Sequence, residues 1–127
     1  MRIITNNPDV KERFPDICEY ISGNVRDVFK KVRDEIHKGA RLVSHPISGS
    51  LKPGQIPYKS VAILPAKSGD IDLRSLAYIE DSIEIYRLTA RKRLAQKDVH
   101  IDYKVIDLDL ITSVLTSNMG VDLYSKR

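Results

Sequence analysis

Short apolar runs alternate along this chain with segments in which apolar residues recur every three or four positions, and this alternation constrains the fold most. The clearest helical segment spans 25–38, and the residues that share its apolar face are Val25, Val28, Phe29, Val32 and Ile36. Asn24 and Asp27 form a capping box before this helix. Gly39 supplies the left-handed residue that commonly ends one.

The remaining elements follow from the same two patterns. Strands are predicted at 2–5, 17–22, 41–45, 60–64 and 99–105, the last because apolar and polar residues alternate there. Helices are predicted at 8–14, 72–96 and 107–118, with Asn7, Asp72 and Asp107 as their caps. Gly120 is predicted to end the last helix, which leaves a frayed tail at 120–127.

This order predicts one α/β domain over 1–127, a layered sandwich of about five strands in a mainly parallel or mixed sheet flanked by about four helices. An antiparallel hairpin of 41–45 and 60–64 is the alternative to parallel pairing. The helix 72–96 would be about 36 Å long, which exceeds the width of a domain of this size. We therefore expect its basic end to project or to form a homodimer contact through 72–97.

Positive charge is concentrated in two stretches. The 127 residues hold 21 Lys and Arg against 17 Asp and Glu, a net charge of +4, yet 36–69 and 85–97 each hold five basic residues and no acidic one. Clustered positive potential attracts phosphates, carboxylates or acidic protein surfaces. Nucleic acid is a less favoured partner, because the chain has no Trp and only two Phe to interleave with the basic residues.

Several other classes of protein and site are disfavoured. No window is apolar enough to span a bilayer and the N-terminus lacks the pattern of a signal peptide, so we expect a cytoplasmic protein that does not enter a membrane. His37, His45 and His100 do not have the spacing of a metal site, and we expect neither metal nor cofactor. Cys18 falls inside a predicted strand, where cysteine is an inert small hydrophobe. The paired carboxylates Asp34 and Glu35 are expected on a solvated helix face.

The strongest candidate site is an anion-binding loop at 44–60, which combines Ser, Gly and Lys residues directly after a predicted strand. The turn after the first strand, 5–8, offers Asn amides and a helix N-terminus, and we expect the two stretches to converge in one basic hollow. The candidate ligand-binding residues are Thr5, Asn6, Asn7, Arg33, His37, His45, Ser48, Gly49, Ser50, Lys52, Tyr58 and Lys59. No catalytic residue is assigned.

Two alternatives to a ligand-binding module remain open. The first is a small enzyme acting on an anionic metabolite, with His45 or His37 as acid–base and Lys52 as oxyanion partner. A nucleophilic Ser48 or Ser50 beside His45 is less favoured, because no G-x-S-x-G elbow is present. The second is a protein-interaction subunit whose basic helix end meets an acidic partner surface.

Three blocks of the sequence resemble the GrdX family, small proteins encoded among glycine reductase genes. They are Ile4-Thr5-Asn6-Asn7-Pro8, the segment from Val32 to Gly39, and the segment from His45 to Ser60. The resemblance implies a bacterial, cytoplasmic accessory protein associated with glycine, sarcosine or betaine reduction, with reductase components as possible partners. It implies no established activity and no catalytic residues.

Overall fold

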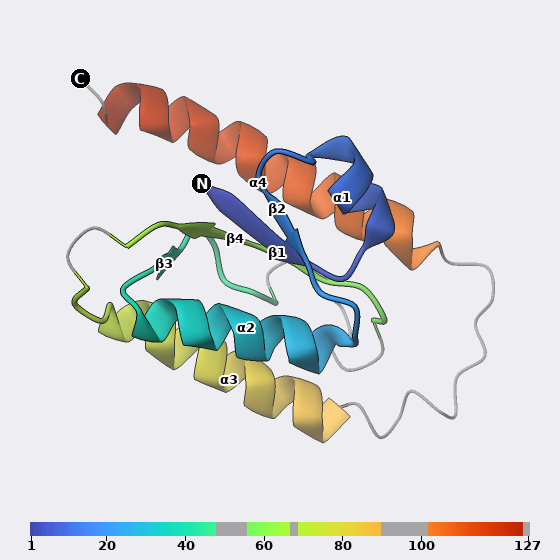
Figure 1. Ribbon diagram of the computed structural model, residues 1–127, viewed down its shortest axis with the longest axis horizontal. Helices are drawn as coiled ribbons and strands as arrows, with labels where there is room; N and C mark the ends of the chain where they lie inside the picture. The colour runs from blue at the N-terminus through green and yellow to red at the C-terminus, as the bar shows by residue number, and fades with distance from the viewer. Residues whose placement is uncertain (48–55, 67–68, 90–101, 126–127) are drawn as a thin grey trace.

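The computed structural model describes residues 1–47, 56–66, 69–89 and 102–125. Figure 1 shows the elements in chain order. They are β1 (Arg2–Thr5), α1 (Pro8–Arg13), β2 (Cys18–Tyr20), α2 (Val25–His37), β3 (Arg41–Leu42), β4 (Ser60–Leu64), α3 (Leu73–Thr89) and α4 (Tyr103–Ser125). The predicted α/β class is confirmed.

The strands form one mixed sheet in the order β2-β1-β4-β3. Only β1 and β2 are parallel; β1 pairs antiparallel with β4, and β4 pairs antiparallel with β3. The hairpin alternative for the third and fourth predicted strands is therefore confirmed, and of the two predicted forms the sheet is mixed, not mainly parallel. The described residues contain four strands instead of the predicted five or so.

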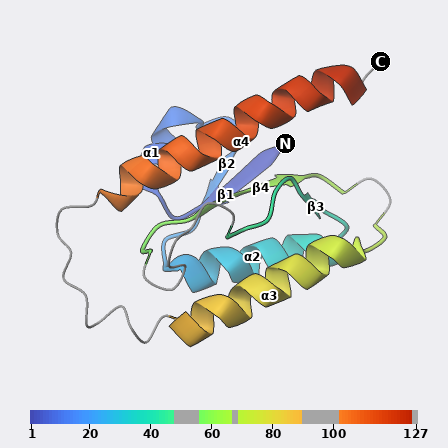
Figure 2. The ribbon, with the colours of Figure 1, turned by 180° about the vertical axis from the view of Figure 1, so that it is seen from behind.

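Helices cover both faces of the sheet, with α1 and α4 on one face and α2 and α3 on the other (Figures 1 and 2). Successive strand residues point to opposite faces, so Ile4 packs with α2 and α3 while its neighbour Ile3 packs with α1 and α4. On β4, Val61 and Ile63 belong to the first cluster and Ala62 to the second. Two cores are thus built on one short sheet.

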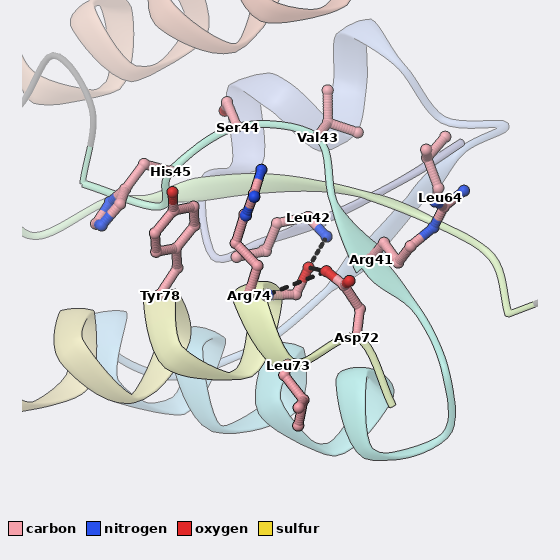
Figure 3. Close-up of a pocket in the computed structure, with 11 residues that line it drawn as sticks. Arg41, Leu42, Val43, Ser44, His45, Leu64, Asp72, Leu73, Arg74 and Tyr78 are labelled. Atoms are coloured by element: carbon pink, nitrogen blue, oxygen red, sulfur yellow. Dashed lines mark hydrogen bonds between the residues drawn. The ribbon is translucent and has the colours of Figure 1, made fainter. Parts of the chain in front are cut away.

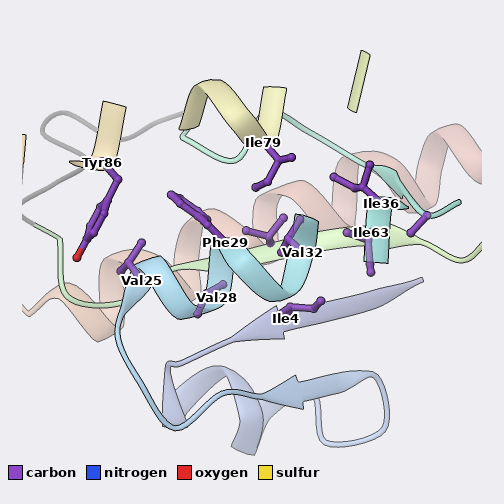
Figure 4. Close-up of a cluster of buried hydrophobic side chains, with 11 residues drawn as sticks. Ile4, Val25, Val28, Phe29, Val32, Ile36, Ile63, Ile79 and Tyr86 are labelled. Carbon is purple, nitrogen blue, oxygen red and sulfur yellow. The ribbon is translucent and has the colours of Figure 1, made fainter. Parts of the chain in front are cut away.

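The helix α2 matches its prediction closely. The Asn24 side chain accepts from the Asp27 amide and the Asp27 side chain accepts from the Asn24 amide, both at 3.0 Å. Gly39 has a φ of 108°, the left-handed conformation expected at the end of this helix. The α2 side chains lie between the sheet and α3, where Phe29 belongs to one core cluster with Ile4, Ile79 and Tyr86 (Figure 4).

The C-terminal half departs from prediction. The strand predicted at 99–105 is wrong for Tyr103–Val105, which form the first turn of α4; 99–101 lie outside the described residues. Asp102, not Asp107, caps this helix, by accepting the Lys104 amide at 3.1 Å. The helix also continues past Gly120 to Ser125, so the prediction that Gly120 ends it is wrong. Asp72 caps α3 as predicted, and α3 is described to Thr89, so its predicted extension to 96 lies outside the described residues.

Glu35 is buried, contrary to the prediction of a solvated face. It pairs with Arg2 at 2.9 Å, Lys38 at 3.3 Å and Lys31 at 3.4 Å. Partial burial raises the pKa of Glu35, but the Lys38 hydrogen bond and the charges of Arg2 and Lys31 outweigh burial, so the pKa is lowered overall.

A lowered carboxyl pKa stabilises the fold above the unfolded-state pKa, and the stabilisation is lost as pH falls through the folded-state value. We expect Glu35→Gln to reduce the free energy of unfolding by about 1 kcal/mol at pH 7 and by much less near pH 3. Urea titrations at both pH values measure this difference. Asp34→Asn, at an exposed neighbouring position, is the control; an equal loss in both variants would contradict the assignment.

Candidate functional site

A closed polar network joins β1, β4 and α4. Thr5 lies opposite Ser60 in the antiparallel register, so both hydroxyls face α4, and their oxygens are 2.7 Å apart. The Ser60 hydroxyl donates to Asp107 Oδ2 at 2.7 Å, and the Ser60 amide donates to Oδ1 at 2.9 Å. Because the Ser60 proton goes to the carboxylate, Thr5 donates to Ser60 and its own oxygen accepts the Asn7 amide at 2.9 Å.

The two asparagines after β1 complete this network. Asn6 donates to the carbonyls of Gly23 at 3.0 Å and Pro57 at 2.9 Å, and its oxygen accepts the Lys59 amide. Asn7 caps α1 through the Asp9 amide and donates to Asp107 at 3.0 Å and to the Lys104 carbonyl. The predicted convergence of 5–8 with the end of the 44–60 segment is confirmed. Both amide groups are already engaged, however, so they hold the fold together and offer no N–H to an anion.

Lys59 lies beside this network, with 7% of its surface exposed. Burial lowers its pKa, although the nearby Asp107 acts in the opposite direction. Ser44, His45, Lys59, Ser60 and Asp107 help to line a space of about 20 Å³, which is room for about one water molecule. This space is therefore too small for a metabolite.

A larger groove opens at the β3 edge of the sheet. Its volume is about 690 Å³, within the range of ligand-binding pockets. Residues 41–45 and Leu64 line one side, and residues 72–75 and Tyr78 of the α3 end line the other (Figure 3). Ser44 and His45 border both this groove and the small space by Asp107.

The α3 residues that line the groove include one cationic and one aromatic side chain, Arg74 and Tyr78. Arg74 and Tyr78 are four residues apart on a helix and share one face. In Figure 3 they rise side by side from α3, and His45 lies beyond the Tyr78 ring. The His45 and Tyr78 ring centroids are 4.8 Å apart at an interplanar angle of 42°. His45 Nδ1 accepts the Ile47 amide at 3.3 Å, so in the neutral ring the proton is on Nε2.

Two arginines in the groove form no salt bridge or side-chain hydrogen bond with the residues that the structure describes. Arg41 and Arg74 are both exposed, and neither guanidinium pairs with a carboxylate or hydrogen bonds to any residue that the structure describes. Asp72 lies nearby, but its Oδ2 accepts the Ser75 amide at 3.1 Å and hydroxyl at 2.6 Å. These Ser75 hydrogen bonds, helped by Arg41 and Arg74, lower the Asp72 pKa and keep it ionised. Ser75 also covers the open β3 edge by accepting the Leu42 amide at 2.9 Å.

The other predicted site residues lie apart from the groove. Arg33 pairs with Glu80 at 3.2 Å and so joins α2 to α3. His37 is exposed at the end of α2 and lines neither space. Tyr58 does not line the groove either; the Lys104 Nζ atom lies 6.0 Å from its ring centroid. Ser48, Gly49, Ser50 and Lys52 lie outside the described residues. Of the eight predicted residues that the structure describes, only His45 lines the groove.

Sequence reasoning placed Ser44 in the candidate loop without assigning it as a ligand-binding residue, missed Arg74 and Tyr78, and counted Arg41 only as one of several basic residues. The signal for Arg74 and Tyr78 is their spacing of four within a predicted helix. Nothing in the sequence indicates that this helix begins beside the 41–45 segment, because that contact depends on the sheet order.

Cys18 is a poor nucleophile. Burial raises its thiol pKa to about 11, and the thiol donates to the Val10 carbonyl at 3.5 Å. Alkylation requires thiolate, so we expect iodoacetamide to modify Cys18 roughly a hundredfold more slowly in the folded protein than in urea at pH 7. Mass spectrometry of timed samples measures both rates, and equal rates would show an accessible, ionisable thiol.

Metal and membrane chemistry find no support in the described residues. No cluster of three or more His, Cys, Asp or Glu side chains there is arranged to hold a metal ion. No helix in the same part of the chain has the length and apolar character that crossing a membrane requires.

Comparison with known proteins places the chain in a family. The family model described as GrdX-like protein matches residues 2–116, which include the sheet, the groove and the polar network. The chain belongs to the GrdX-like family. No curated protein and no solved structure matches this GrdX-like chain.

Proposed function

We propose that this GrdX-like protein is a bacterial, cytoplasmic accessory or ligand-sensing protein of the glycine, sarcosine and betaine reductase system, and that it binds a small carboxylate or phosphate. The observation that carries the proposal is the pair of exposed arginines, Arg41 and Arg74, in a groove of about 690 Å³. Arginine binds both anions with two parallel hydrogen bonds, which favours it at such sites.

The charge and shape of the groove support an anionic ligand. Its charged lining is Arg41, Arg74 and Asp72, and Asp72 already accepts two hydrogen bonds from Ser75. The groove therefore has a net positive lining. Ser44 and Tyr78 add hydroxyl groups, which are neutral hydrogen-bond donors, to the lining of the same space.

Thermal unfolding in the presence of phosphate, acetyl phosphate, glycine and betaine tests the proposal. A ligand at 100 times its Kd stabilises the folded protein by about 2.7 kcal/mol. We expect at least one of these compounds to raise the Tm at millimolar concentration. We expect Arg74→Ala and Arg41→Ala each to weaken its binding about tenfold or more.

Arg26→Ala is the matched control, since Arg26 is exposed on α2 and outside the groove. No rise in Tm with any of the four compounds would contradict the proposal. An equal rise in Tm for the wild type, Arg41→Ala and Arg74→Ala would show that the compound binds outside the groove.

A small enzyme is the second candidate, and the position of His45 favours it. The His45 ring is half-buried, packs beside Tyr78 and is part of the groove lining. In this case His45→Ala abolishes turnover of an anionic substrate while the Tm is retained. Binding without turnover of any compound tested leaves the accessory function.

A further inference from the structure

The aromatic side chains that line the groove indicate the chemical class of the ligand more closely than the charged side chains do. We infer that the anion bound beside Arg74 carries a planar aromatic body, which packs on the exposed part of the Tyr78 ring. This inference rests on the proposed anion site and adds the chemical class of the ligand.

The first support is the size of the groove. A phosphate or carboxylate group alone occupies a small part of about 690 Å³, whereas pockets of this volume take organic ligands that bury most of their surface. Leu42 and Leu64 give the groove apolar wall beside its charged residues. An inorganic anion would leave that apolar wall in water.

The second support is the state of the Tyr78 ring. Tyr78 is 39% exposed, a large value for an aromatic side chain at a groove wall. His45 packs against it at 4.8 Å, which restrains the ring orientation before any ligand binds. A restrained aromatic surface loses little conformational entropy when a second ring packs on it.

The third support is the relation between the ring and the charge. The helix places Arg74 one turn before Tyr78 on the same face, and both side chains rise toward the residues that follow β3 (Figure 3). A monoester or carboxylate held by the guanidinium therefore leaves its substituent beside the Tyr78 ring. The Ser44 and Tyr78 hydroxyls border the same space and can donate to the anionic head.

Isothermal titration with methyl phosphate and phenyl phosphate tests the inference, because the two monoesters share a head group and differ in the ring. We expect phenyl phosphate to bind about tenfold more tightly than methyl phosphate. Tyr78→Ala should remove this difference, so that methyl phosphate and phenyl phosphate bind the variant with equal affinity. Tyr78→Phe should keep the preference, which separates the ring from its hydroxyl.

Tyr20→Ala is the control, since Tyr20 is also 39% exposed but lies on β2 outside the groove. Equal affinities for the two monoesters in the wild type would overturn the aromatic ligand and leave the anion site standing. An equal loss of both affinities in Tyr78→Ala would also overturn it, because Tyr78 would then act on the head group. If neither monoester binds while glycine or acetyl phosphate does, the aromatic class is wrong; if no anion binds, the site itself is wrong.

Discussion

Replacing Asp107 with alanine is expected to lower the free energy of unfolding by about 3–5 kcal/mol. Asp107 is 4% exposed and accepts hydrogen bonds from the Asn7 amide group and from both the amide and hydroxyl of Ser60. Alanine leaves all of these donors buried without an acceptor. It also leaves the buried Lys59 without the carboxylate that favours its charged form.

Asp109→Ala provides the matched control, because Asp109 is exposed on the same helix two residues later. Its effect should stay within about 0.5 kcal/mol. Urea unfolding followed by circular dichroism measures both variants. A loss in Asp107→Ala no greater than that in Asp109→Ala would show that α4 is held by apolar contacts alone, chiefly those of Ile111 and Leu115.

The second large effect is expected on the opposite face of the sheet. Phe29 is 1% exposed, and its ring meets that of Tyr86 edge-to-face with centroids 6.1 Å apart (Figure 4). Phe29→Ala removes the side chain that joins the sheet to α3 and leaves a cavity, at a cost of about 3–5 kcal/mol. The change in the urea midpoint, at constant slope, measures the cost.

Phe29→Leu preserves most of the volume and should cost less than about 1.5 kcal/mol. If the core around Phe29 is closely packed, the free energies of unfolding of the two variants differ by more than about 1 kcal/mol. If Phe29→Ala and Phe29→Leu proved equally stable, the space around α2 would be loosely packed.

The helix α2 was predictable because each local signal agrees with its tertiary role. The apolar face, the Asn24–Asp27 capping box and Gly39 all favour the same boundaries, and burial between sheet and α3 requires the same face. The strands β1 and β4 were equally clear as short apolar runs. The pairing partners of these strands could not be predicted, since parallel and antiparallel pairing depend on contacts between residues distant in the sequence.

The start of α4 shows how a local pattern misleads. Residues 99–105 alternate between apolar and polar residues, as an exposed strand does. The Asp102 side chain instead caps a helix through the Lys104 amide, and Val105 is left 47% exposed. Asp107 therefore lies inside the helix, on the face shared with Ile111 and Leu115, and not at its cap.

The candidate site was likewise predicted only in part. Thr5 to Asn7 and residues 57–60 meet as predicted, but the Asn6 side chain bonds the backbone of Pro57 and Lys59, and the Thr5 hydroxyl bonds the hydroxyl of Ser60. The groove brings β3 together with α3, elements separated by about thirty residues in the sequence, and no local pattern predicts that contact. Among the described residues, His45 is the one predicted ligand-binding residue that also lines the groove.

The most direct test of the central claim is a phosphate titration followed by two-dimensional ¹H–¹⁵N NMR on the intact chain. We predict saturable shifts of the backbone amides of residues 41–45 and 72–78, with smaller effects at Asn6 and Asn7, and loss of these shifts in Arg74→Ala. Saturable shifts centred on 5–7 and 57–60 with the groove amides unmoved, or no saturable shift at all, would contradict the assignment of the anion site to the β3–α3 groove.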